Sequence, residues 1–414
     1  MKTDNNIQNC GKCGLCLSVC PVYAQMKQEQ VSPRAKLRLI KAFRNKDIES
    51  SPLLNDIISK CLMCGSCTAA CPSGIDHFSW FMDMRAEMKK AQGHSPAIKS
   101  LVYLLGREYR IRFGAGLAKA GRRIIPDRFA ASYKLGNIPL KKFPRLNKIP
   151  LRRSAGSRVA PDGMVNRGKV IYFTGCATNY LYEDTGSAVI GILRHMGYEI
   201  MIPEGQTCCS IPLLFHGACE KALKNIRANI RALSIQDADA VIVDCSTCGH
   251  ALEHEYPKFM QKNGHDSEAA SFIASKTVHI LDFINQHFDL LEFDRNFSQK
   301  TRITYHAPCH TKNHGQDHLM IEALLKKLEF ADYRPVCDTD ACCGGGGTFF
   351  YEFAQIARKM AEKKIRNAKA VHPKFWLTDC PVCRMNLDGS MDDDKNNPEI
   401  IHPVSFIYSG LKHR

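Results

Sequence analysis

The sequence lacks the features that mark a membrane-spanning or exported protein. Its 414 residues contain no apolar run of membrane-spanning length, and the N-terminus MKTDNNIQNC has no basic region leading into an apolar one. Nucleotide-binding motifs are also missing, since neither GxxxxGK[ST] nor a strand followed by GxGxxG is present. These absences exclude an integral membrane protein, argue against nucleotide binding by this chain, and lead us to expect a cytoplasmic protein.

Acidic residues are scarce in one segment. Residues 98–169 contain 18 Lys and Arg against only three acids, a net charge of +15 out of +16 for the whole chain, and no cysteine. Such a charge is typical of segments that bind nucleic acid or an anionic membrane surface.

The same segment contains the stretch IKSLVYLLGREYRIRF, which predicts a basic amphipathic helix. Its apolar face would consist of Ile98, Leu101, Val102, Leu105 and Tyr109. A helix of this kind can lie on an anionic membrane, which would place the protein peripherally on the inner face of the cell membrane. A solvated linker or a partner-docking surface explains the stretch equally well.

Against these absences stands an abundance of cysteine, with 20 residues in one chain. In a reducing compartment so many cysteines indicate metal or redox chemistry rather than structural disulfides. Apolar residues at 44% and charged residues at 24% are ordinary for a soluble globular protein, and the length suffices for two or three domains.

The N-terminal cysteines form two runs, CGKCGLCLSVCP and CLMCGSCTAACP. Both match the CxxCxxCxxxCP run of bacterial ferredoxins, in which three cysteines hold one four-iron cubane and the fourth ligates the other. A zinc ribbon would instead use pairs of CxxC without the third and fourth cysteines. We therefore assign two [4Fe-4S] clusters, one to Cys10, Cys13, Cys16 and Cys71, the other to Cys61, Cys64, Cys67 and Cys20.

The remaining cysteines occur in two copies of one pattern. Cys176 is followed after 31 residues by Cys208-Cys209, and after 35 more by Cys245-x-x-Cys248. In the second copy the intervals are 32 and 36, from Cys309 through Cys342-Cys343 to Cys380-x-x-Cys383. Each copy supplies five thiols, one more than tetrahedral zinc uses, which favours a cluster over structural zinc or buried thiols that merely pack. Cys219 and Cys337 fit neither pattern, and we expect them to be structural.

The segments between these cysteines alternate between strand and helix. KVIYFTGC, AVIVDCSTC, RITYHAPC and KFWLTDCPVC each predict a strand that ends near a cysteine, and YRPVC a further strand. Alternating strands and helices predict a largely parallel sheet in each copy, with ligands beyond the carboxyl ends of the strands. Cys176, Cys245, Cys309 and Cys380 fall at such ends.

The expected fold class is therefore α+β overall: a mostly helical ferredoxin-type domain followed by two repeated α/β, Rossmann-like, cysteine-rich domains. The expected boundaries are a two-cluster ferredoxin domain at 1–97, a basic segment at 98–168, and cysteine-rich domains at 169–298 and 299–414.

The two ferredoxin runs followed by two five-cysteine sets resemble the cysteine-rich, CCG-domain iron–sulfur proteins. That family includes the glycolate or lactate oxidase iron–sulfur subunit, the D subunit of heterodisulfide reductase and the C subunit of anaerobic glycerol-3-phosphate dehydrogenase. The resemblance implies an electron-transfer subunit that exchanges electrons with a flavoprotein, with FAD on the partner rather than on this chain. It also implies a non-cubane four-iron cluster at one or both five-cysteine sets, and an acceptor such as the membrane quinone pool, a b-type cytochrome or another electron carrier.

The physiological substrate stays open within this resemblance. CPVYAQMKQEQVSPRAKLRLIKAF is similar to the hydroxyacid oxidase subunits, which favours a 2-hydroxyacid, whereas two complete five-cysteine sets are more like the D subunit of heterodisulfide reductase. A rival from a different class is a zinc-stabilised nucleic-acid-binding protein, but no usual nucleic-acid-binding signature is present, and we expect no nucleic acid partner.

Two features beside the second set carry hypotheses of their own. HAPCHTKNHGQDH places His306, His310, His314 and His318 around Cys309; they could be capping and surface residues, and His310, next to a ligand, is the best candidate for proton transfer. Gly344–Gly347 follow Cys342 and Cys343, whereas Ser210 follows Cys209 in the first copy. The glycines would let backbone approach the second set closely and leave it open to a substrate or partner.

Overall fold

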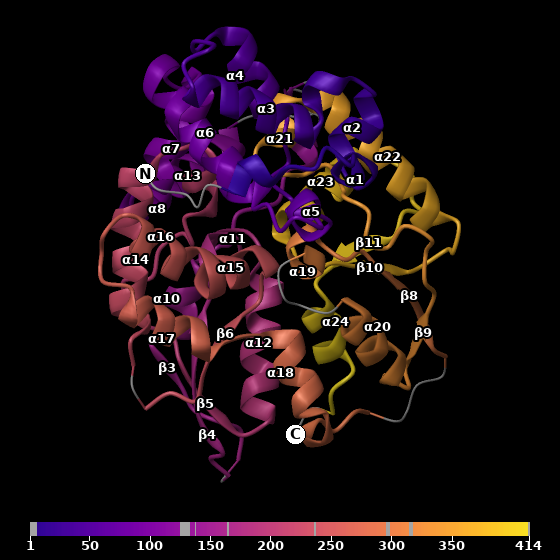
Figure 1. Ribbon diagram of the computed structural model, residues 1–414. Coiled ribbons are helices and arrows are strands. Elements are labelled where there is room, and N and C mark those ends of the chain that lie inside the picture. Colours follow the sequence, from indigo (N-terminus) through magenta and orange to yellow (C-terminus); the bar gives the residue numbers. More distant parts are fainter. Residues whose placement is uncertain are drawn as a thin grey trace.

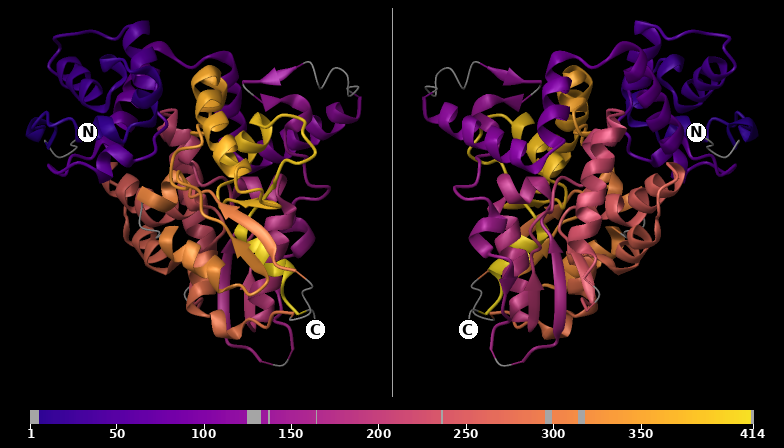
Figure 2. Two further views of the ribbon diagram at one scale, coloured as in Figure 1. Left: turned by 90° about the vertical axis from the view of Figure 1, so that its right-hand side faces the viewer. Right: turned by 90° about the vertical axis from the view of Figure 1, so that its left-hand side faces the viewer.

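The computed structural model describes residues 6–124, 133–136, 138–163, 165–235, 237–294, 299–313 and 318–412. A helical N-terminal region lies above two α/β units that stand side by side (Figure 1). We refer to residues 6–92 as the N-terminal region, to 168–290 as the first unit and to 301–409 as the second unit. Side views show the N-terminal region projecting from one upper corner of a molecule that narrows below (Figure 2).

The N-terminal region consists of short helices. They are η1 (Asn6–Asn9), α1 (Leu15–Ser18), α2 (Pro21–Met26), η2 (Glu29–Val31), α3 (Pro33–Arg44), α4 (Pro52–Ser59), α5 (Ser66–Ala69) and α6 (His77–Gln92). Local sequence explains their starts: Ser32 Oγ accepts a hydrogen bond from the Ala35 amide at 3.2 Å, with proline at the first helical position of α3. Asp76 caps α6 in the same way through the Ser79 amide at 3.0 Å.

The first unit contains a five-stranded sheet in the order β3-β5-β4-β6-β7. Its strands are β3 (Arg158–Val159), β4 (Gly168–Phe173), β5 (Tyr198–Met201), β6 (Ala240–Val243) and β7 (Thr277–His279). The helices are α11 (Gly175–Tyr180), α12 (Glu183–His195), α13 (Ile211–Phe215), α14 (Cys219–Leu233), α15 (Ser246–His250), η4 (Ala251–Glu255), α16 (Tyr256–Lys262), α17 (Glu268–Lys276), α18 (Ile280–Gln286) and η5 (Phe288–Leu290). All pairings are parallel except the antiparallel edge strand β3.

The second unit repeats this arrangement in a four-stranded parallel sheet, ordered β11-β10-β8-β9. Its strands are β8 (Thr301–Tyr305), β9 (Ala331–Tyr333), β10 (Phe375–Leu377) and β11 (Glu399–Ile401). Its helices are α19 (Cys309–Asn313), α20 (His318–Lys327), α21 (Phe349–Glu352), α22 (Ala354–Lys369), α23 (Pro381–Ser390) and α24 (Pro403–Ser409). Read from the other edge, the order matches β5-β4-β6-β7, so the predicted repeat and the predicted parallel sheets are confirmed.

One predicted strand was misplaced. The prediction put it at YRPVC, but β9 covers Ala331–Tyr333 and ends before Pro335. Proline has no backbone N–H to donate to a neighbouring strand, which explains why the strand stops there.

The two units share a hydrophobic core at their junction. Helix α12 packs against α24, and the buried cluster contains Val189 and Ile192 from the first unit together with Val404 and Ile407 from the second. The N-terminal region is joined to the first unit by a second core, in which Phe78 stacks edge-on against Phe215 at 5.7 Å between ring centroids. The three parts are therefore packed as one body.

The basic segment is wound over both units. It forms α7 (Pro96–Leu105), α8 (Glu108–Ile124), β1 (Lys134–Leu135), β2 (Ile138–Pro139), η3 (Leu140–Lys142) and α10 (Leu151–Ala155), and it contributes β3. Ile138 is fully buried in a core that it shares with the second unit, while Leu151 is buried in the core that the two units share. This segment thus ties the two units together.

The prediction of one continuous amphipathic helix over residues 98–113 was wrong. The helix breaks at Gly106–Arg107, and Ile98 and Val102 of α7 are only 3% and 4% exposed because they pack into the core. The exposed apolar side chains are instead Tyr103 of α7 and Tyr109, Phe113 and Leu117 of α8. Among the described residues, no helix is long and apolar enough to cross a membrane.

The junction between the N-terminal region and the first unit gives a testable prediction. Gly217 lies between α13 and α14 with φ +67°, and a Cβ there would come within 2.5 Å of the Ala86 Cα on α6. Gly205 has φ +88° with nothing within 4 Å of its Cβ position, so Gly205→Ala isolates the backbone cost of about 1–2 kcal/mol. Gly217→Ala adds a clash with backbone of about 1–3 kcal/mol.

We therefore expect Gly217→Ala to lower the thermal unfolding midpoint more than Gly205→Ala. It should also make the link between the N-terminal region and the first unit more sensitive to limited proteolysis. Equal effects of the two variants would mean that α6 does not hold this junction together.

Candidate metal centres

The eight N-terminal cysteines line two separate cavities. The outer set surrounds one cavity and consists of Cys10, Cys13, Cys16 and Cys71. The inner set surrounds the other and consists of Cys20, Cys61, Cys64 and Cys67. Each cavity is lined by three cysteines of one run and the fourth cysteine of the other run, which is the grouping that the ferredoxin pattern predicts.

The surroundings of the two cavities differ. The outer cavity is also lined by Lys12 and Arg34, and its Cys13 is exposed. The inner cavity is mainly apolar, and burial raises the pKa of Cys20 to about 11. Lys36, only 2% exposed, lies beside this inner set; burial lowers the pKa of its ammonium group, and the neighbouring Cys61 and Cys20 oppose that shift. The outer set is therefore accessible from the surface, and the inner set is enclosed.

The first five-cysteine set gathers at the carboxyl ends of β4 and β6. Cys176 lies in α11, and its Sγ is 3.9 Å from that of Cys208. Cys208 and Cys209 lie in the loop before α13, and the neighbouring thiols of Cys208 and Cys248 lower the pKa of Cys209. Cys248 lies in α15, and Cys245 precedes that helix. The structure thus brings all five predicted ligands together.

The second five-cysteine set gathers in the corresponding place. Cys309 begins α19 after β8, Cys342 and Cys343 lie in the loop after β9, and Cys380 and Cys383 flank the start of α23. The Sγ atoms of Cys343 and Cys383 are 3.1 Å apart. Five thiols in one place fit a multi-iron cluster better than a single tetrahedral ion.

A buried hydrogen-bonded trio holds each of these sets. In the first unit, Tyr172 and Thr178 each donate to Asp244 Oδ2 at 2.7 Å. In the second unit, Tyr305 and Thr311 donate to the carboxylate of Asp379 at 2.6 and 2.8 Å. Since the tyrosine and threonine flank the first cysteine and the aspartate precedes the fourth, each trio fixes two ligands relative to each other.

These trios were missed by the sequence analysis, although the sequence carries a signal for them. Both copies contain Tyr-x-x-x-Cys-x-Thr, as IYFTGCAT and TYHAPCHT, and Asp-Cys-x-x-Cys, as DCSTC and DCPVC. Only an alignment of the two copies with each other, including residues between the cysteines, would have revealed it.

The two five-cysteine sets meet each other at the junction of the units. The thiols of Cys245 and Cys380 interact, and this interaction is the largest influence that holds the pKa of Cys380 well below its ordinary value. The Ser246 amide donates to the Asp379 carbonyl at 3.3 Å, and His402 Nε2 pairs with the Asp244 carbonyl at 2.8 Å. The sets are thus neighbours rather than independent sites.

The inner set lies against the second five-cysteine set. Asn313 at the end of α19 donates to the Cys64 carbonyl at 2.9 Å and to Ser66 Oγ at 3.0 Å. Burial, followed by the nearby Cys64 thiolate, raises the pKa of Cys309. Cys67 of the inner set also interacts electrostatically with Cys16 of the outer set. The outer set thus neighbours the inner set, the inner set neighbours the second five-cysteine set, and the second neighbours the first.

The loop of residues 344–347 also contacts the N-terminal region. A Cβ on Gly346 would lie 2.4 Å from Leu62 Cδ2 of the N-terminal region, and one on Gly344 would lie 2.6 Å from the Ala357 carbonyl oxygen of α22. Gly345 N donates to Cys343 Sγ at 3.3 Å, so the backbone does approach the set closely. The space beside Gly344 and Gly346 is filled by the protein itself, so the hypothesis that these glycines leave the set open to a substrate is not supported. In the first unit Ser210 adopts the same left-handed conformation as Gly344, with φ +75° against +86°.

The histidines near Cys309 separate into different roles. His310, the candidate for proton transfer, is buried; Nδ1 lies 2.9 Å from Thr247 Oγ1, Nε2 lies 3.4 Å from the Met63 carbonyl, and burial lowers its pKa. It therefore bridges both units and the N-terminal region. His306 lies beside Cys343 and Cys383, and His314 falls outside the described residues. Cys219 and Cys337 lie apart from all four sets, the first partly buried and the second exposed.

Comparisons with known proteins match the N-terminal region and parts of both units to known families. The chain matches the family described as "Cysteine-rich domain" at residues 170–253 and 303–388, and the "4Fe-4S dicluster domain" at residues 6–75. It is 30% identical to "Lactate utilization protein A" of Geobacillus sp. (strain WCH70), over 58% of this chain and 99% of that protein.

Two further relatives align over nearly the whole chain. "Probable glycolate oxidase iron-sulfur subunit" of Bacillus subtilis (strain 168) is 25% identical over 99% of this chain and 95% of its own length. The D subunit of dihydromethanophenazine:CoB--CoM heterodisulfide reductase from Methanosarcina acetivorans is 23% identical over 98% of this chain and 94% of its own length.

From the trios we predict that the loss of one tyrosine hydroxyl lowers the iron content of the set in its own unit and leaves the other set unchanged. Tyr172→Phe removes a hydrogen bond to a buried carboxylate, worth about 1.5–3 kcal/mol, and should reduce iron at the first set. Tyr305→Phe should do the same at the second set. Iron and sulfide per chain after anaerobic gel filtration, with low-temperature EPR, measure the loss.

Tyr198→Phe is the matched control, because this buried tyrosine of β5 lies outside both trios. It should retain the iron of the unmodified protein. Full iron in Tyr172→Phe and Tyr305→Phe, with only a lower unfolding temperature, would show that the trios serve folding alone.

Proposed function

The chain belongs to the family of CCG-domain iron–sulfur proteins, and from this we propose that it is the electron-transfer subunit of a flavin-dependent oxidoreductase complex. The complex would oxidise a 2-hydroxyacid of the glycolate or lactate type. The relatives named for glycolate oxidase and lactate utilization support this substrate class. Iron–sulfur clusters supply one-electron carriers when bound, which suits a subunit that accepts two electrons from a flavin one at a time.

The observation that carries the proposal is the order of the four cysteine sets. We assign the outer and inner sets to two [4Fe-4S] clusters, with the ligands predicted from sequence, and the five-cysteine sets to one or two non-cubane four-iron clusters. The contacts Asn313–Cys64 and Cys245–Cys380 join successive sets directly. A zinc-stabilised or nucleic-acid-binding protein has no need for such a continuous series.

The exposed outer set is the proposed docking site for the flavoprotein. Cys13 is exposed, and Lys12 and Arg34 flank its cavity, so a partner surface with acidic residues would fit there. We propose that FAD is bound by that partner and that the final acceptor is a membrane quinone, a b-type cytochrome or another electron carrier. We also propose that the segment boundaries after residues 97, 168 and 298 separate the functional parts.

A second candidate function is disulfide chemistry of the heterodisulfide reductase D type. It is favoured by one specific observation, the direct contact of the two complete five-cysteine sets at Cys245 and Cys380. The relative from Methanosarcina acetivorans aligns over 98% of this chain and 94% of its own length. A C subunit of anaerobic glycerol-3-phosphate dehydrogenase is the third member of this group of alternatives.

The test of the main proposal is anaerobic purification with any co-purifying flavoprotein. About eight irons are expected from the outer and inner sets, and more from the five-cysteine sets. Addition of glycolate or lactate to the complex should reduce the clusters, as monitored by EPR. Reduction by a thiol pair but not by a hydroxyacid would favour the second function, and stoichiometric zinc without an EPR signal would contradict both.

We further propose that α8 binds an anionic membrane surface. Tyr109, Phe113 and Leu117 recur every four residues and are 58%, 67% and 59% exposed, and they line a groove together with Arg110 and Arg112. Basic residues near an anionic surface contribute about 1 kcal/mol each. This arrangement would bring the protein close to a quinone pool.

The membrane proposal predicts that Phe113→Ser with Leu117→Ser weakens binding to phosphatidylglycerol vesicles at least tenfold in co-sedimentation. Leu319→Ser is the control, because Leu319 on α20 is equally exposed at 61% but lies on the second unit. Binding of the unmodified protein should decrease at high salt and on phosphatidylcholine. Equal binding by both variants would assign α8 to a protein partner instead.

A further inference from the structure

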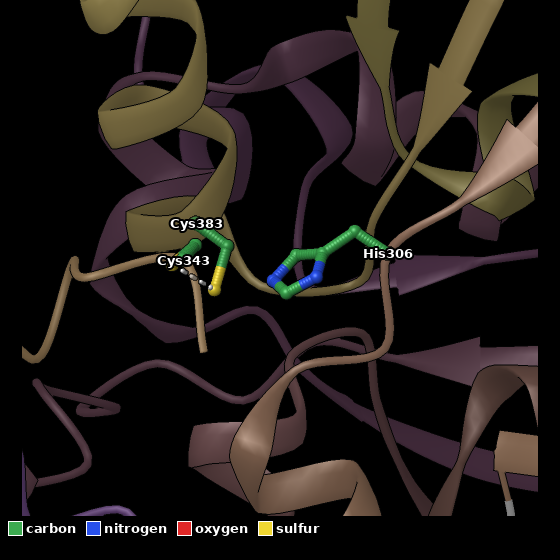
Figure 3. A group of neighbouring side chains, drawn as sticks. All are labelled: His306, Cys343 and Cys383. Atoms are coloured by element: carbon green, nitrogen blue, oxygen red, sulfur yellow. Dashed lines mark hydrogen bonds between the residues drawn. The ribbon is translucent and has the colours of Figure 1, made fainter. Parts of the chain in front are cut away.

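His306 occupies a fixed position directly beside the second five-cysteine set. It follows β8, is 1% exposed, and its backbone amide donates to the Leu377 carbonyl at 2.8 Å. Figure 3 shows its ring directed from the end of the strand toward Cys343 and Cys383. A ring nitrogen of His306 and the two sulfurs all lie within 4.8 Å of one another. Ligands of one metal ion with bonds of about 2.0–2.3 Å lie roughly 4 Å apart, so small side-chain rotations suffice to place all three on one ion.

The hydrogen bonding of the ring decides which nitrogen is available. Nδ1 lies 3.3 Å from the Thr339 carbonyl, which can only accept a hydrogen bond, so Nδ1 carries the proton. Nε2 then has a free lone pair and is buried without a hydrogen bond of ordinary geometry among the residues that the structure describes, and the ring interacts with the Cys343 thiol. A backbone carbonyl that fixes one ring nitrogen while the other points at a metal is the usual arrangement for histidine ligands.

Two other buried histidines near the junction, His402 and His310, differ in this respect. Both ring nitrogens of His402 are occupied, because Nδ1 accepts from the Val404 amide at 3.0 Å and Nε2 pairs with the Asp244 carbonyl. Both nitrogens of His310 have partners as well, at Thr247 and Met63. His306 alone of these three combines a fixed tautomer with an unoccupied nitrogen directed at thiols.

The first five-cysteine set has no counterpart of this imidazole. Alignment of the two copies on Tyr172 and Tyr305 places Phe173 at the position of His306. Phe173 is completely buried in the core that joins the first unit to the N-terminal region. Each set has five cysteines and a supporting trio at matching positions. The two sets therefore differ at the position that directly follows the tyrosine of the trio.

We propose that His306 Nε2 is a protein ligand of the metal centre at the second five-cysteine set, which makes that set chemically distinct from the first. The inference rests on the proposed presence of an iron–sulfur cluster there. A neutral imidazole places less negative charge on iron than a thiolate, and clusters with histidine ligands have higher reduction potentials. The second centre would thus have a higher potential than an all-thiolate centre in the same place.

The decisive experiment uses the complete, anaerobically purified protein with its clusters in place. Protein labelled with ¹⁵N only in histidine is reduced and examined by pulsed EPR against unlabelled protein. We expect a nitrogen hyperfine coupling that changes from the ¹⁴N to the ¹⁵N pattern, as direct coordination of an imidazole requires. Selective labelling separates this coupling from that of the Gly344 and Gly345 amides, which also lie beside the sulfurs.

Variants then assign the coupling to one residue. His306→Cys should retain iron, lose the histidine coupling and lower the midpoint potential of one centre, whereas His310→Gln should retain the coupling. Iron at the second set without any histidine coupling in the unmodified protein would overturn the proposal while leaving the proposed function intact. Iron confined to the outer and inner sets, as counted in the same samples, would overturn it together with the proposed role of the five-cysteine sets.

Discussion

The carboxylates of Asp244 and Asp379 are the groups on which the arrangement of the two units depends. Each is fully enclosed, accepts hydrogen bonds from a tyrosine and a threonine of its own unit, and immediately precedes a cysteine that contacts the other set. Their backbone carbonyls accept from the opposite unit, through His402 and Ser246. Because buried carboxylates are costly unless they are hydrogen-bonded, these contacts strongly restrict how the strands, the ligand helices and the two units can be placed.

The repeat and the grouping of the cysteines could be read from the sequence because both depend on local spacing. The interval between cysteines fixes where strands end, and the order β5-β4-β6-β7 recurs as β9-β8-β10-β11. What the sequence did not reveal depends on contacts between distant segments. Ile98 and Val102 read as an outward apolar face because periodicity gives the face of a helix but not its partner, which here is the core itself. Similarly, the basic sequence around Ile138 does not indicate that this side chain is buried in a core with residues of the second unit.

The loops of the two units differ where different parts of the N-terminal region contact them. The loop with Cys64 docks on α19 and on Gly346 of the second unit, while the first unit meets α6 through Gly217 and Phe215. Glycines replace the Ser210-Ile211-Pro212 sequence at the place where Leu62 fills the space against the second loop. The geometry that the two copies share and the loops in which they differ thus have separate physical causes. The trios account for the shared geometry, and the docking of the N-terminal region accounts for the different loops.

Charge provides a further reason for the two sets to differ. Asp244 and Asp379 place a negative charge beside each set, and a nearby negative charge disfavours an added electron. Both units have such a carboxylate at the same position, so its presence alone does not distinguish the two sets. One position that differs is occupied by Phe173, which is apolar, in the first unit and by His306, which lies beside Cys343 and Cys383, in the second. The second set also lies beside the inner set, so the imidazole that we propose as a ligand is found at the five-cysteine set that incoming electrons would reach first.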